Sequence, residues 1–372
     1  MKYECIKCKI SDIGKVVTGK TPKTAVSEYY GGNIPFLTPS DDMSAKYVYK
    51  TNKTLTESGK KSVKGAIIPS NSICVSCIGS DLGKVIITTN ETVTNQQINS
   101  IIVNTEKFDI NFIYYSMLIL GKIINYHSKT STAVPIVNKS TFSQYEINCP
   151  SLETQKQIAS ILSALDDKIE LNNRINKNLE QQAQTVFEDM FPNIIYGEHS
   201  IGEYITPKRG KGLLSKNAIF GDVPVVAGGL EPATYHNTAN TTAPVLTISA
   251  SGANSGYVNL WTIPVWSSDS SFIDSSMTNN VYFWYVMLKT RQQEIYDSQT
   301  GSAQPHIYPK HISVLPITKL NEKDISNFTR IVTPMFDKIG KNKYENKRLA
   351  ELRDTLLPKL MNGEIDVSEI KI

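Results

Sequence analysis

One long segment of mixed polar and apolar residues occurs twice in this chain of 372 residues, with the two copies about half the chain length apart. The first copy covers 151–190 and the second covers 321–360, and both contain the tripeptide Asp-Lys-Ile, at 167–169 and at 337–339. Both copies have a helical pattern, so each half of the chain is expected to end in a long helix. Such a repeat predicts a molecule with internal two-fold symmetry that acts on something with two parts.

Apolar residues in both copies recur at a mean spacing of about 3.5 residues, which is typical of a coiled coil. Two asparagines interrupt each apolar seam at corresponding places, Asn172 and Asn176 in the first copy and Asn342 and Asn346 in the second. A buried asparagine weakens such a seam but fixes its register. We therefore expect the two helices to pair in antiparallel orientation, with these seam residues also at the contact: Leu165, Ile169, Leu179, Ile339 and Leu349.

Two points of this helix prediction have alternatives. The asparagines could instead face solvent where the two helices separate. Pro334 lies inside the second copy, where a proline removes one helical hydrogen bond. It either bends the second helix or begins it, with Thr333 as the N-cap.

The segments that precede the two helices also resemble each other. Apolar strand-like runs at 73–78 and 245–249 each lead into a glycine-rich turn, and aromatic helix-like segments follow at 112–118 and 282–288. This pattern predicts a mixed α+β module in each half. The expected fold class is α+β, with two mixed modules related by pseudo-two-fold symmetry and separated by two long antiparallel coiled-coil helices; the expected boundaries are 1–150, 151–190, 191–318 and 319–372.

Composition and charge indicate a globular protein of the cytoplasm. Hydrophobic residues make up 40% of the chain and charged residues 20%, no apolar run of roughly 18 residues occurs, and the charged residues 1–10 do not form a secretory signal. The odd number of cysteines, 5, favours reduced thiols over a disulfide framework. Segment 1–150 holds 17 lysines against 11 acidic residues and could attract a polyanion, whereas 191–318 is close to neutral.

Two Cys-x-x-Cys pairs, Cys5 with Cys8 and Cys74 with Cys77, would suggest a zinc site if they were considered alone. The repeat argues against zinc, because the aligned positions of the second half hold residues that cannot supply four such ligands: Asn193, Tyr196, Thr247 and Ala250. We therefore expect buried reduced thiols and no metal site.

The chain contains no combination of residues that is typical of catalysis. It has no GxxxxGK[ST] phosphate loop, no HExxH motif and no Asn-Pro-Pro-Tyr-like tetrapeptide, which an adenine methyltransferase would need to grip its base. Residues 79–83 superficially match the start of a nucleotide-binding loop, but a turn between strands is the better interpretation. We expect no catalytic residue.

Three groups of residues carry a family resemblance that extends from one end of the chain to the other. They are the start of the first helix at 150–169 (PSLETQKQIASILSALDDKI), the end of the second helix at 356–365 (LLPKLMNGEI), and the opening of the first module at 19–22 (GKTP) and 32–36 (GNIPF). Each motif alone is weak, but the combination is specific. The chain resembles the specificity subunit of type I restriction–modification systems.

The resemblance implies a subunit without catalytic activity. Modules 1–150 and 191–318 would be target-recognition domains that each read one half of a bipartite double-stranded DNA target. The central helical spacer 151–190 and the distal spacer with its tail, 319–372, would set the gap and bind two modification subunits. Those methyltransferase partners would hold S-adenosylmethionine and methylate adenine, and restriction subunits with ATP and Mg²⁺ would cleave DNA, so no cofactor is expected on this chain.

Basic residues cluster at the opening of both modules, and we expect them to bind phosphates or base edges: Lys15, Lys20, Lys23, Lys208, Arg209, Lys211 and Lys216. The alternative is an ordinary solvated surface. Arg209 is the best candidate for a base contact because its guanidinium can grip guanine in the major groove. Asn95 and Gln96 could pair with adenine, although the alternation around Val93 and Ile98 could equally place them on the solvent face of a strand.

The outer faces of the helices, which include Glu170, Arg174, Arg348 and Glu351, are candidates for binding the methyltransferase, with a plain solvated face as the alternative. Two other functions remain open at this point. One is a self-contained DNA methyltransferase or nuclease, against which the missing motifs weigh. The other is a coiled-coil scaffold with no role in binding DNA.

Overall fold

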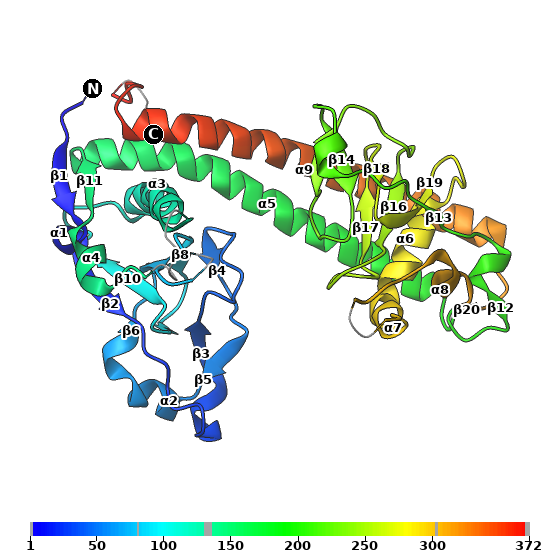
Figure 1. Cartoon of the computed structure of the whole chain (residues 1–372), viewed down its shortest axis with the longest axis horizontal. Coiled ribbons are helices and arrows are strands. Elements are labelled where there is room, and N and C mark those ends of the chain that lie inside the picture. Colours follow the sequence, from blue (N-terminus) through cyan, green and yellow to red (C-terminus); the bar gives the residue numbers. More distant parts are fainter. Residues whose placement is uncertain (1–2, 80–81, 130–135, 302–303, 369–372) are drawn as a thin grey trace. The chain divides into compact units, whose positions relative to one another are not determined.

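The computed structural model describes residues 3–79, 82–129, 136–301 and 304–368 (Figure 1). By contacts, the chain divides into two compact units. Unit 1 comprises 1–169 together with 348–372, and unit 2 comprises 170–347. Each unit therefore combines a module with parts of both long helices, while the four boundaries expected from the sequence stay predictions.

Unit 1 contains three sheets beside its helices. The five-stranded sheet has the order β2-β10-β7-β8-β4, with bounds Gly14–Thr18, Ile98–Val103, Ile73–Ser76, Val85–Thr88 and Tyr47–Val48. The four-stranded sheet has the order β5-β3-β9-β6, with bounds Lys53–Leu55, Tyr30–Leu37, Thr92–Thr94 and Ile67–Ile68. The two-stranded sheet pairs β1, Ile6–Lys9, with β11, Glu146–Cys149. The helices are α1 Ile10–Ile13, η1 Ser27–Tyr29, α2 Glu57–Ser62, η2 Lys64–Ala66, α3 Ile110–Lys129 and α4 Lys139–Gln144.

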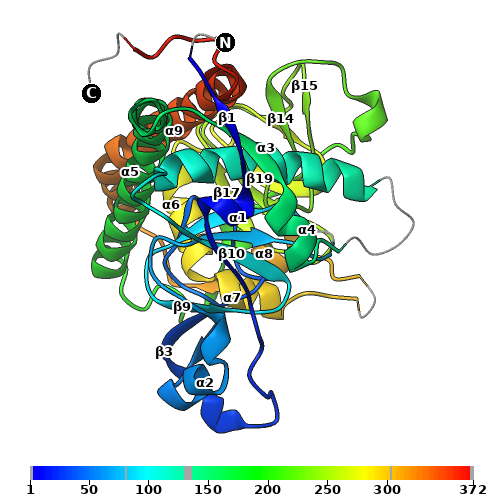
Figure 2. The ribbon, with the colours of Figure 1, turned by 90° about the vertical axis from the view of Figure 1, so that its left-hand side faces the viewer.

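The core of unit 1 lies on both faces of the five-stranded sheet. Strands β7 and β8 are buried along their whole length, which matches their nearly continuous apolar sequences. Helix α3, which Figure 2 labels, packs over these two strands. It buries Phe112 and Tyr115 completely, so the aromatic segment expected to be helical covers one sheet face. Gly79 and Gly83, between β7 and β8, adopt positive φ angles, and Ser80 and Asp81 lie outside the described residues.

Unit 2 repeats this plan with fewer strands in each of its two larger sheets. Its four-stranded sheet has the order β13-β19-β16-β17, with bounds Lys208–Arg209, Ser270–Asp274, Val245–Ser249 and Val258–Trp261. Its three-stranded sheet has the order β15-β14-β18, with bounds Thr234–His236, Val223–Val226 and Trp266–Ser267. Strands β12, His199–Ser200, and β20, Pro316–Ile317, form a pair. The helices are η3 Ile201–Glu203, η4 Ser215–Asn217, α6 Val281–Thr290, α7 Gln292–Asp297 and α8 Pro309–Ser313.

The strand pairings of unit 2 all have a counterpart in unit 1, which adds β4 and β6 at the edges of its two larger sheets. The order β2-β10-β7-β8 of unit 1 matches β13-β19-β16-β17 of unit 2, with antiparallel neighbours throughout. In the second sheets, β3 pairs antiparallel with β5 and parallel with β9, just as β14 pairs antiparallel with β15 and parallel with β18. The expectation of a mixed α and β fold is confirmed.

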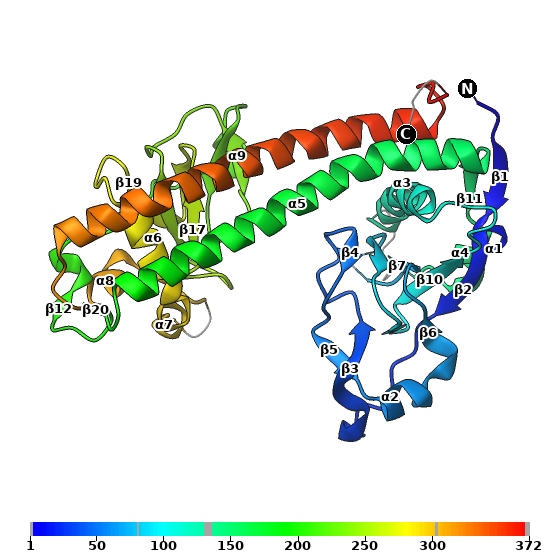
Figure 3. The same ribbon diagram turned by 180° about the vertical axis from the view of Figure 1, so that it is seen from behind.

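The long helices are α5, Leu152–Met190, and α9, Glu322–Met361 (Figure 3). Their contacts have opposite chain order: Asp166 meets Arg353, Asn172 meets Asn346, and Asn176 meets Asn342. Within unit 2, where two of these contacts lie, the helices therefore run antiparallel. Helix α9 continues through Pro334, so the alternative in which this proline begins the helix is wrong. Of the helices in the described part of the chain, none is both long enough and apolar enough to cross a membrane.

Candidate functional site

In unit 1, the segment after strand β2 crosses a turn between the two large sheets. The Lys20 N–H donates to the Thr94 carbonyl at 2.8 Å, and the Gly19 N–H donates to the Ile98 carbonyl at 3.1 Å. A side chain at Gly19 has no room, because its Cβ would lie 2.0 Å from the Asn95 carbonyl oxygen. Because Gly19 has no side chain, the backbone can lie directly against this turn, and the exposed Lys20 follows beside it.

The crossed turn is Asn95–Gln97, between β9 and β10, so the alternative that places these residues on a strand face is wrong. Asn95 is buried, and its amide donates to Gln97 Oε1 at 2.8 Å while its Oδ1 accepts from the Gln97 N–H at 3.1 Å. Gln96 is exposed and accepts a hydrogen bond from the Thr21 hydroxyl at 2.7 Å. Asn95 therefore shapes the turn, while Gln96 presents its amide to solvent next to Lys20.

The other two lysines of this group are also exposed. Lys15 lies on strand β2, opposite Ile102 of β10, and not in a loop. Lys23 follows the Gly19–Thr21 crossing, and its carbonyl accepts from the Val26 N–H at 3.1 Å. Unit 1 thus brings Lys20 and Gln96 together from distant parts of the sequence, with Lys15 and Lys23 on the adjoining strand and loop.

Unit 2 builds the same crossing with a second Gly-Lys dipeptide. The Gly210 N–H donates to the Ser270 carbonyl at 2.8 Å, and the Lys211 N–H donates to the Ser267 carbonyl at 2.9 Å. A Cβ at Gly210 would lie 2.4 Å from the Ser267 carbonyl oxygen. The crossed turn, 268–269, joins β18 to β19 as 95–97 joins β9 to β10.

The tripeptide Thr-Pro-Lys occurs in both modules but does not mark equivalent positions in the two structures. The tripeptide Thr-Pro-Lys follows strand β2 in unit 1, at 21–23, but it leads into strand β13 in unit 2, at 206–208. The equivalent dipeptides are therefore Gly19-Lys20 and Gly210-Lys211. Both lysines are exposed, and each follows a glycine that the close approach of the turn requires.

Arg209 differs from the lysines because it is already paired. Its Nη2 lies 2.5 Å from Asp269 Oδ1, and the two side chains are 41% and 37% exposed. The other oxygen of Asp269 accepts a hydrogen bond from the Ser251 hydroxyl. To contact a base, the guanidinium must share or exchange this carboxylate. Lys208 on β13 and Lys216 on η4 are exposed.

Sequence reasoning missed Asp269, Ser251 and Thr21 as parts of these sites. Asp269 is 60 positions from Arg209, and it belongs to no motif that would link the two. Only the pairing of β13 with β19 brings them together. The signal that was present in the sequence was the Gly-Lys dipeptide, which recurs in both modules.

The four seam asparagines meet inside unit 2. Asn172 donates to Asn346 Oδ1 at 2.9 Å, and Asn342 donates to Asn176 Oδ1 at 2.8 Å. Asn172 and Asn342 are completely buried, so the alternative in which these asparagines face solvent is wrong. Of the other predicted seam residues, Ile339 is buried, and four are half-buried: Leu165, Ile169, Leu179 and Leu349. On the outer faces, Arg174, Arg348 and Glu351 are exposed and Glu170 is half-buried.

A second polar cluster fastens the helices to the module within unit 1. The Tyr115 hydroxyl of α3 donates to Asp166 Oδ2 at 2.5 Å, and Arg353 Nη1 lies 2.7 Å from Asp166 Oδ1. Burial and the Asp166 carboxylate raise the pKa of Tyr115, which keeps this hydroxyl a hydrogen-bond donor. Lys46 is buried beneath Tyr115 and donates to Ser163 Oγ at 3.0 Å.

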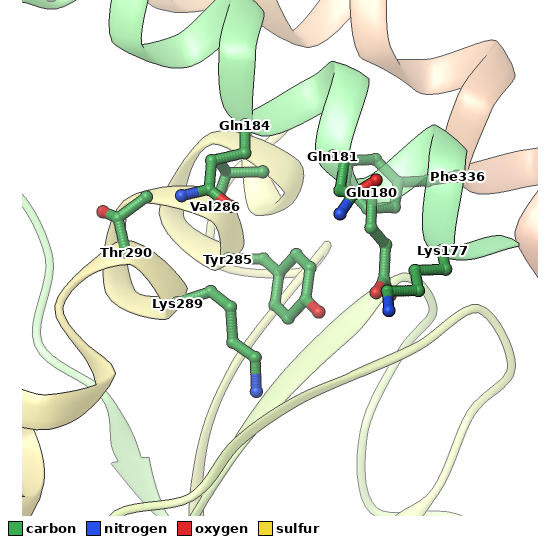
Figure 4. Close-up of a pocket in the computed structure, with 9 residues that line it drawn as sticks. All are labelled: Lys177, Glu180, Gln181, Gln184, Tyr285, Val286, Lys289, Thr290 and Phe336. Carbon is green, nitrogen blue, oxygen red and sulfur yellow. The ribbon is translucent and has the colours of Figure 1, made fainter. Parts of the chain in front are cut away.

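Unit 2 contains a pocket between helices α5 and α6 (Figure 4). It is lined by Lys177, Glu180, Gln181, Gln184, Tyr285, Val286, Lys289, Thr290 and Phe336. Burial and the nearby Glu180 carboxylate raise the pKa of Tyr285, and burial lowers the pKa of Lys289. The Lys289 amine donates to the Val258 carbonyl at 2.9 Å and lies 4.3 Å from the ring centroid of Tyr257. These two contacts hold the Lys289 amine inside unit 2.

The cysteines are free, and four of the 5 are buried. Strand register aligns Cys74 with Thr247 and Cys77 with Ala250, as the sequence comparison predicted. The β1–β11 pair corresponds to the β12–β20 pair, and this correspondence aligns Cys8 with His199. The alignment of Cys8 with Tyr196 is therefore wrong. Among the residues that the structure describes, no group of three or more His, Cys, Asp or Glu side chains is placed to hold a metal ion.

Comparisons with known proteins agree on one family. The family model described as type I restriction modification DNA specificity domain matches residues 4–181. The type I restriction enzyme MjaIX specificity subunit of Methanocaldococcus jannaschii is 28% identical over 97% of this chain and 94% of its own length. The HindI specificity subunit of Haemophilus influenzae is 34% identical over 51% of this chain and 40% of its own length.

One solved structure supports the fold. The crystal structure of a type I restriction–modification system S subunit from M. genitalium matches with a TM-score of 0.57 and 20% sequence identity. The match covers 96% of this chain and 96% of the other. At this identity the likeness concerns the fold alone, and it extends over both units and both long helices.

Proposed function

We propose that the chain is a type I restriction–modification specificity subunit and that its two units each read one half of a bipartite DNA target. In this role the chain would give a restriction–modification complex its sequence specificity without being an enzyme itself. The observation that carries the proposal is the pair of Gly-Lys crossings. Gly19-Lys20 and Gly210-Lys211 occupy the same place in two modules of equal strand order, each with an exposed lysine next to an inter-sheet turn.

The neighbouring residues differ between the two crossings, as expected of readers of two different half-sites. Unit 1 presents Gln96, whose amide can pair with adenine, and unit 2 presents Arg209, whose fork can grip guanine. The surrounding lysines, Lys15 and Lys23 in unit 1 and Lys208 and Lys216 in unit 2, would bind phosphates and fix the position of each module on the duplex. Asn95 acts indirectly by shaping the turn that carries Gln96.

We further propose that α5 and α9 form a coiled coil with pseudo-two-fold symmetry. The repeat aligns Asn172 with Asn342 and Asn176 with Asn346, and a two-fold axis converts the bond from Asn172 to Asn346 into a bond from Asn342 to Asn176. Both hydrogen bonds are present. A symmetric polar cluster of this kind would fix the helix register and, through it, the gap between the half-sites.

The partners follow from the family. We propose that two modification subunits bind the helices, with Arg174, Arg348, Glu170 and Glu351 at the contact, and that restriction subunits complete the complex. S-adenosylmethionine would be held by the modification subunits, and ATP with Mg²⁺ by the restriction subunits. The complex would act in the cytoplasm, where it meets double-stranded DNA.

The test is methylome sequencing of cells that express this chain together with the methyltransferase encoded beside it. The expected result is adenine methylation at a two-part sequence with an unspecified gap. The purified chain alone should transfer no methyl group from S-adenosylmethionine. Methylation at a single uninterrupted sequence would contradict the division of labour between the units, and methyl transfer by the chain alone would contradict the non-catalytic role.

A further inference from the structure

The largest exposed apolar side chain of unit 2 lies on the loop that follows the Gly210-Lys211 crossing. Phe220 is 96% exposed, and Leu214 and Ile219 on the same loop are 63% and 60% exposed. Leaving three large apolar side chains in water forgoes the stabilisation that burial would provide. A cluster of this kind on a protein surface usually marks a binding site. We call residues 211–221 the tip loop.

Hydrogen bonds hold the tip loop closed at its base. The Ile219 N–H donates to His236 Nδ1 at 2.9 Å, and Trp266 Nε1 donates to the Lys211 carbonyl at 2.8 Å. The His236 and Trp266 rings meet edge to face with their centroids 5.1 Å apart. The two ends of the loop are thus joined through a buried histidine and a tryptophan, and its apolar side chains are presented on a fixed support.

The positive charges on and beside the tip loop indicate what kind of ligand it binds. Lys211 and Lys216 lie within the loop, and Lys208 lies just before it, while 191–318 as a whole is close to neutral. Exposed lysines around exposed apolar groups suit a ligand with anionic edges and apolar faces. Double-stranded DNA has this chemistry, because its phosphates surround stacked bases between which apolar side chains can insert.

Unit 1 uses the corresponding stretch differently. The residues after Lys20 lead to Tyr29 and Tyr30, which are only half-exposed. The Tyr30 hydroxyl donates to the Pro22 carbonyl at 2.8 Å, and its ring packs edge to face against Phe36 at 6.4 Å. These aromatic rings support the module, whereas Phe220 contacts little of its own unit. The two units therefore share the position of this loop, whereas the exposed apolar side chains on it are particular to unit 2.

We propose that the tip loop is a DNA wedge: Phe220 inserts against the bases at or beside the half-site read by unit 2, and partly unstacks one base step. Leu214 and Ile219 would cover the sugar edges on either side, and Lys211 and Lys216 would bind the flanking phosphates. This inference rests on the proposed reading of DNA by unit 2. It assigns part of the specificity to base-step deformability and not only to base-edge hydrogen bonds.

The experiment uses the chain assembled with its methyltransferase partner on duplexes of the target found by methylome sequencing. 2-Aminopurine replaces one base at a time through the half-site of unit 2 and its flanks, and its fluorescence reports unstacking. The wild-type complex should raise the fluorescence at one step, and Phe220→Ala should abolish that rise and weaken target binding by about 5- to 150-fold. Fluorescence that persists in the variant belongs to the base that the methyltransferase flips.

Two further variants make the result specific. Phe220→Leu should keep part of the rise, because it keeps an apolar wedge without a ring. Leu230→Ala removes another exposed apolar side chain, at the far end of the β14–β15 hairpin, and should change neither fluorescence nor affinity. Since Phe220 and Leu230 are exposed, all three variants should unfold at the same urea concentration as the wild type.

Three outcomes would overturn the proposal. Equal fluorescence profiles for wild type and Phe220→Ala would show that Phe220 unstacks nothing. Loss of co-purification with the methyltransferase in Phe220→Ala would identify the tip loop as a protein contact. If the wild-type complex itself failed to prefer its target over other DNA, the proposed function would fall together with the wedge.

Discussion

Arg209 depends for its role on a carboxylate that is distant in sequence. Asp269 Oδ1 lies 2.5 Å from the Arg209 guanidinium, so this side chain is less available to a phosphate. Guanine suits it better, because a two-fold hydrogen bond to the base compensates for a shared or lost contact with Asp269. We predict that Arg209→Ala relaxes recognition in the half-site of unit 2 only, by about 1–3 kcal/mol at one base pair. Methylome sequencing measures this change; equal relaxation of both half-sites would refute it.

Lys216→Ala is the matched comparison, since this exposed lysine should contact a phosphate. It should weaken binding to all sequences alike and lower the slope of log affinity against log salt by about 1. Titrations of target and unrelated duplexes over a range of salt concentrations separate the two variants. A change of sequence preference in Lys216→Ala would assign this lysine to a base edge instead.

Cys74 gives unit 1 a pH-dependent stability. Burial raises the pKa of this thiol from 9.0 to about 12. Above pH 9 the unfolded chain releases the proton while the folded chain keeps it, so the contribution to stability is complete below pH 9 and is lost as the pH rises toward 12. The free energy of unfolding should therefore fall by about 1 kcal/mol between pH 9 and 10 through this group.

Cys74→Ala should remove this part of the alkaline loss. Urea unfolding under reducing conditions at pH 7, 9 and 10 measures this effect. The decrease in the free energy of unfolding that Cys74→Ala causes should become smaller as the pH rises. Cys5→Ala is the control, because Cys5 is only partly buried and should change the pH dependence less. An identical cost of Cys74→Ala at all three pH values would show that the thiol is not protonated selectively in the folded state.

At the scale of single residues, exposure was predictable and partners were not. The lysines at 15, 20, 23, 208, 211 and 216 are exposed as expected, because charged side chains on strand ends and loops seldom lose their solvation. The Asp269 carboxylate and the Gln97 amide that engages Asn95 were not foreseen. Such pairs form only when sheet pairing and turn geometry bring the groups together.

At the scale of the helices, the asparagine cluster predicts a non-additive response. Asn342 is completely buried, and its Oδ1 has no hydrogen-bond partner among the described residues. Asn176→Leu would also deprive its amide nitrogen of an acceptor, which should cost about 1–3 kcal/mol. The double variant Asn176→Leu with Asn342→Leu should recover most of this stability, since two apolar groups replace a partly satisfied pair.

A double-mutant cycle by urea unfolding measures the coupling. The outcome that contradicts the prediction is a double variant whose loss equals the sum of the two single losses. The symmetry-related pair, Asn346→Leu with Asn172→Leu, serves as an internal comparison and should respond in the same direction. A response of opposite sign would argue against the two-fold arrangement of the cluster.

The extents of the two helices were accessible from periodicity, whereas the position of their core was partly missed. Phe187 and Phe328 are buried, and their rings meet edge to face at 5.5 Å, although neither was assigned to the seam. Here α5 and α9 pack against the aromatic face of α6, where Phe283 joins the cluster. A seam drawn for two helices alone does not include the side that a third helix covers.

At the scale of the whole molecule, the repeat predicted the architecture better than it predicted the alignment. Strand order and pairing recur in both units, because the repeated apolar runs and turns specify the same connections. The loops between them differ in length, so the residue shift between equivalent positions changes along the chain. Gly19 corresponds to Gly210, whereas Cys74 corresponds to Thr247. Loop insertions are inexpensive on a surface, and they are where the two half-sites can be read differently.

The helices themselves should determine the gap between the half-sites. The junction of the two compact units crosses α5 after Ile169 and α9 after Lys347. Inserting four residues at both places adds about 6 Å to each helix and nearly preserves its face. The gap in the methylated target should lengthen by one or two base pairs at about 3.4 Å each.

The control inserts the same four residues into α5 alone. The asparagine contacts of unit 2 and the Asp166–Arg353 contact of unit 1 can then no longer both keep their register, so this insertion should reduce stability and methylation without defining a new gap. Methylome sequencing distinguishes the outcomes. A paired insertion that leaves the gap unchanged would mean that the spacing is set by the modification subunits, with the helices serving only to hold the two recognition domains on one chain.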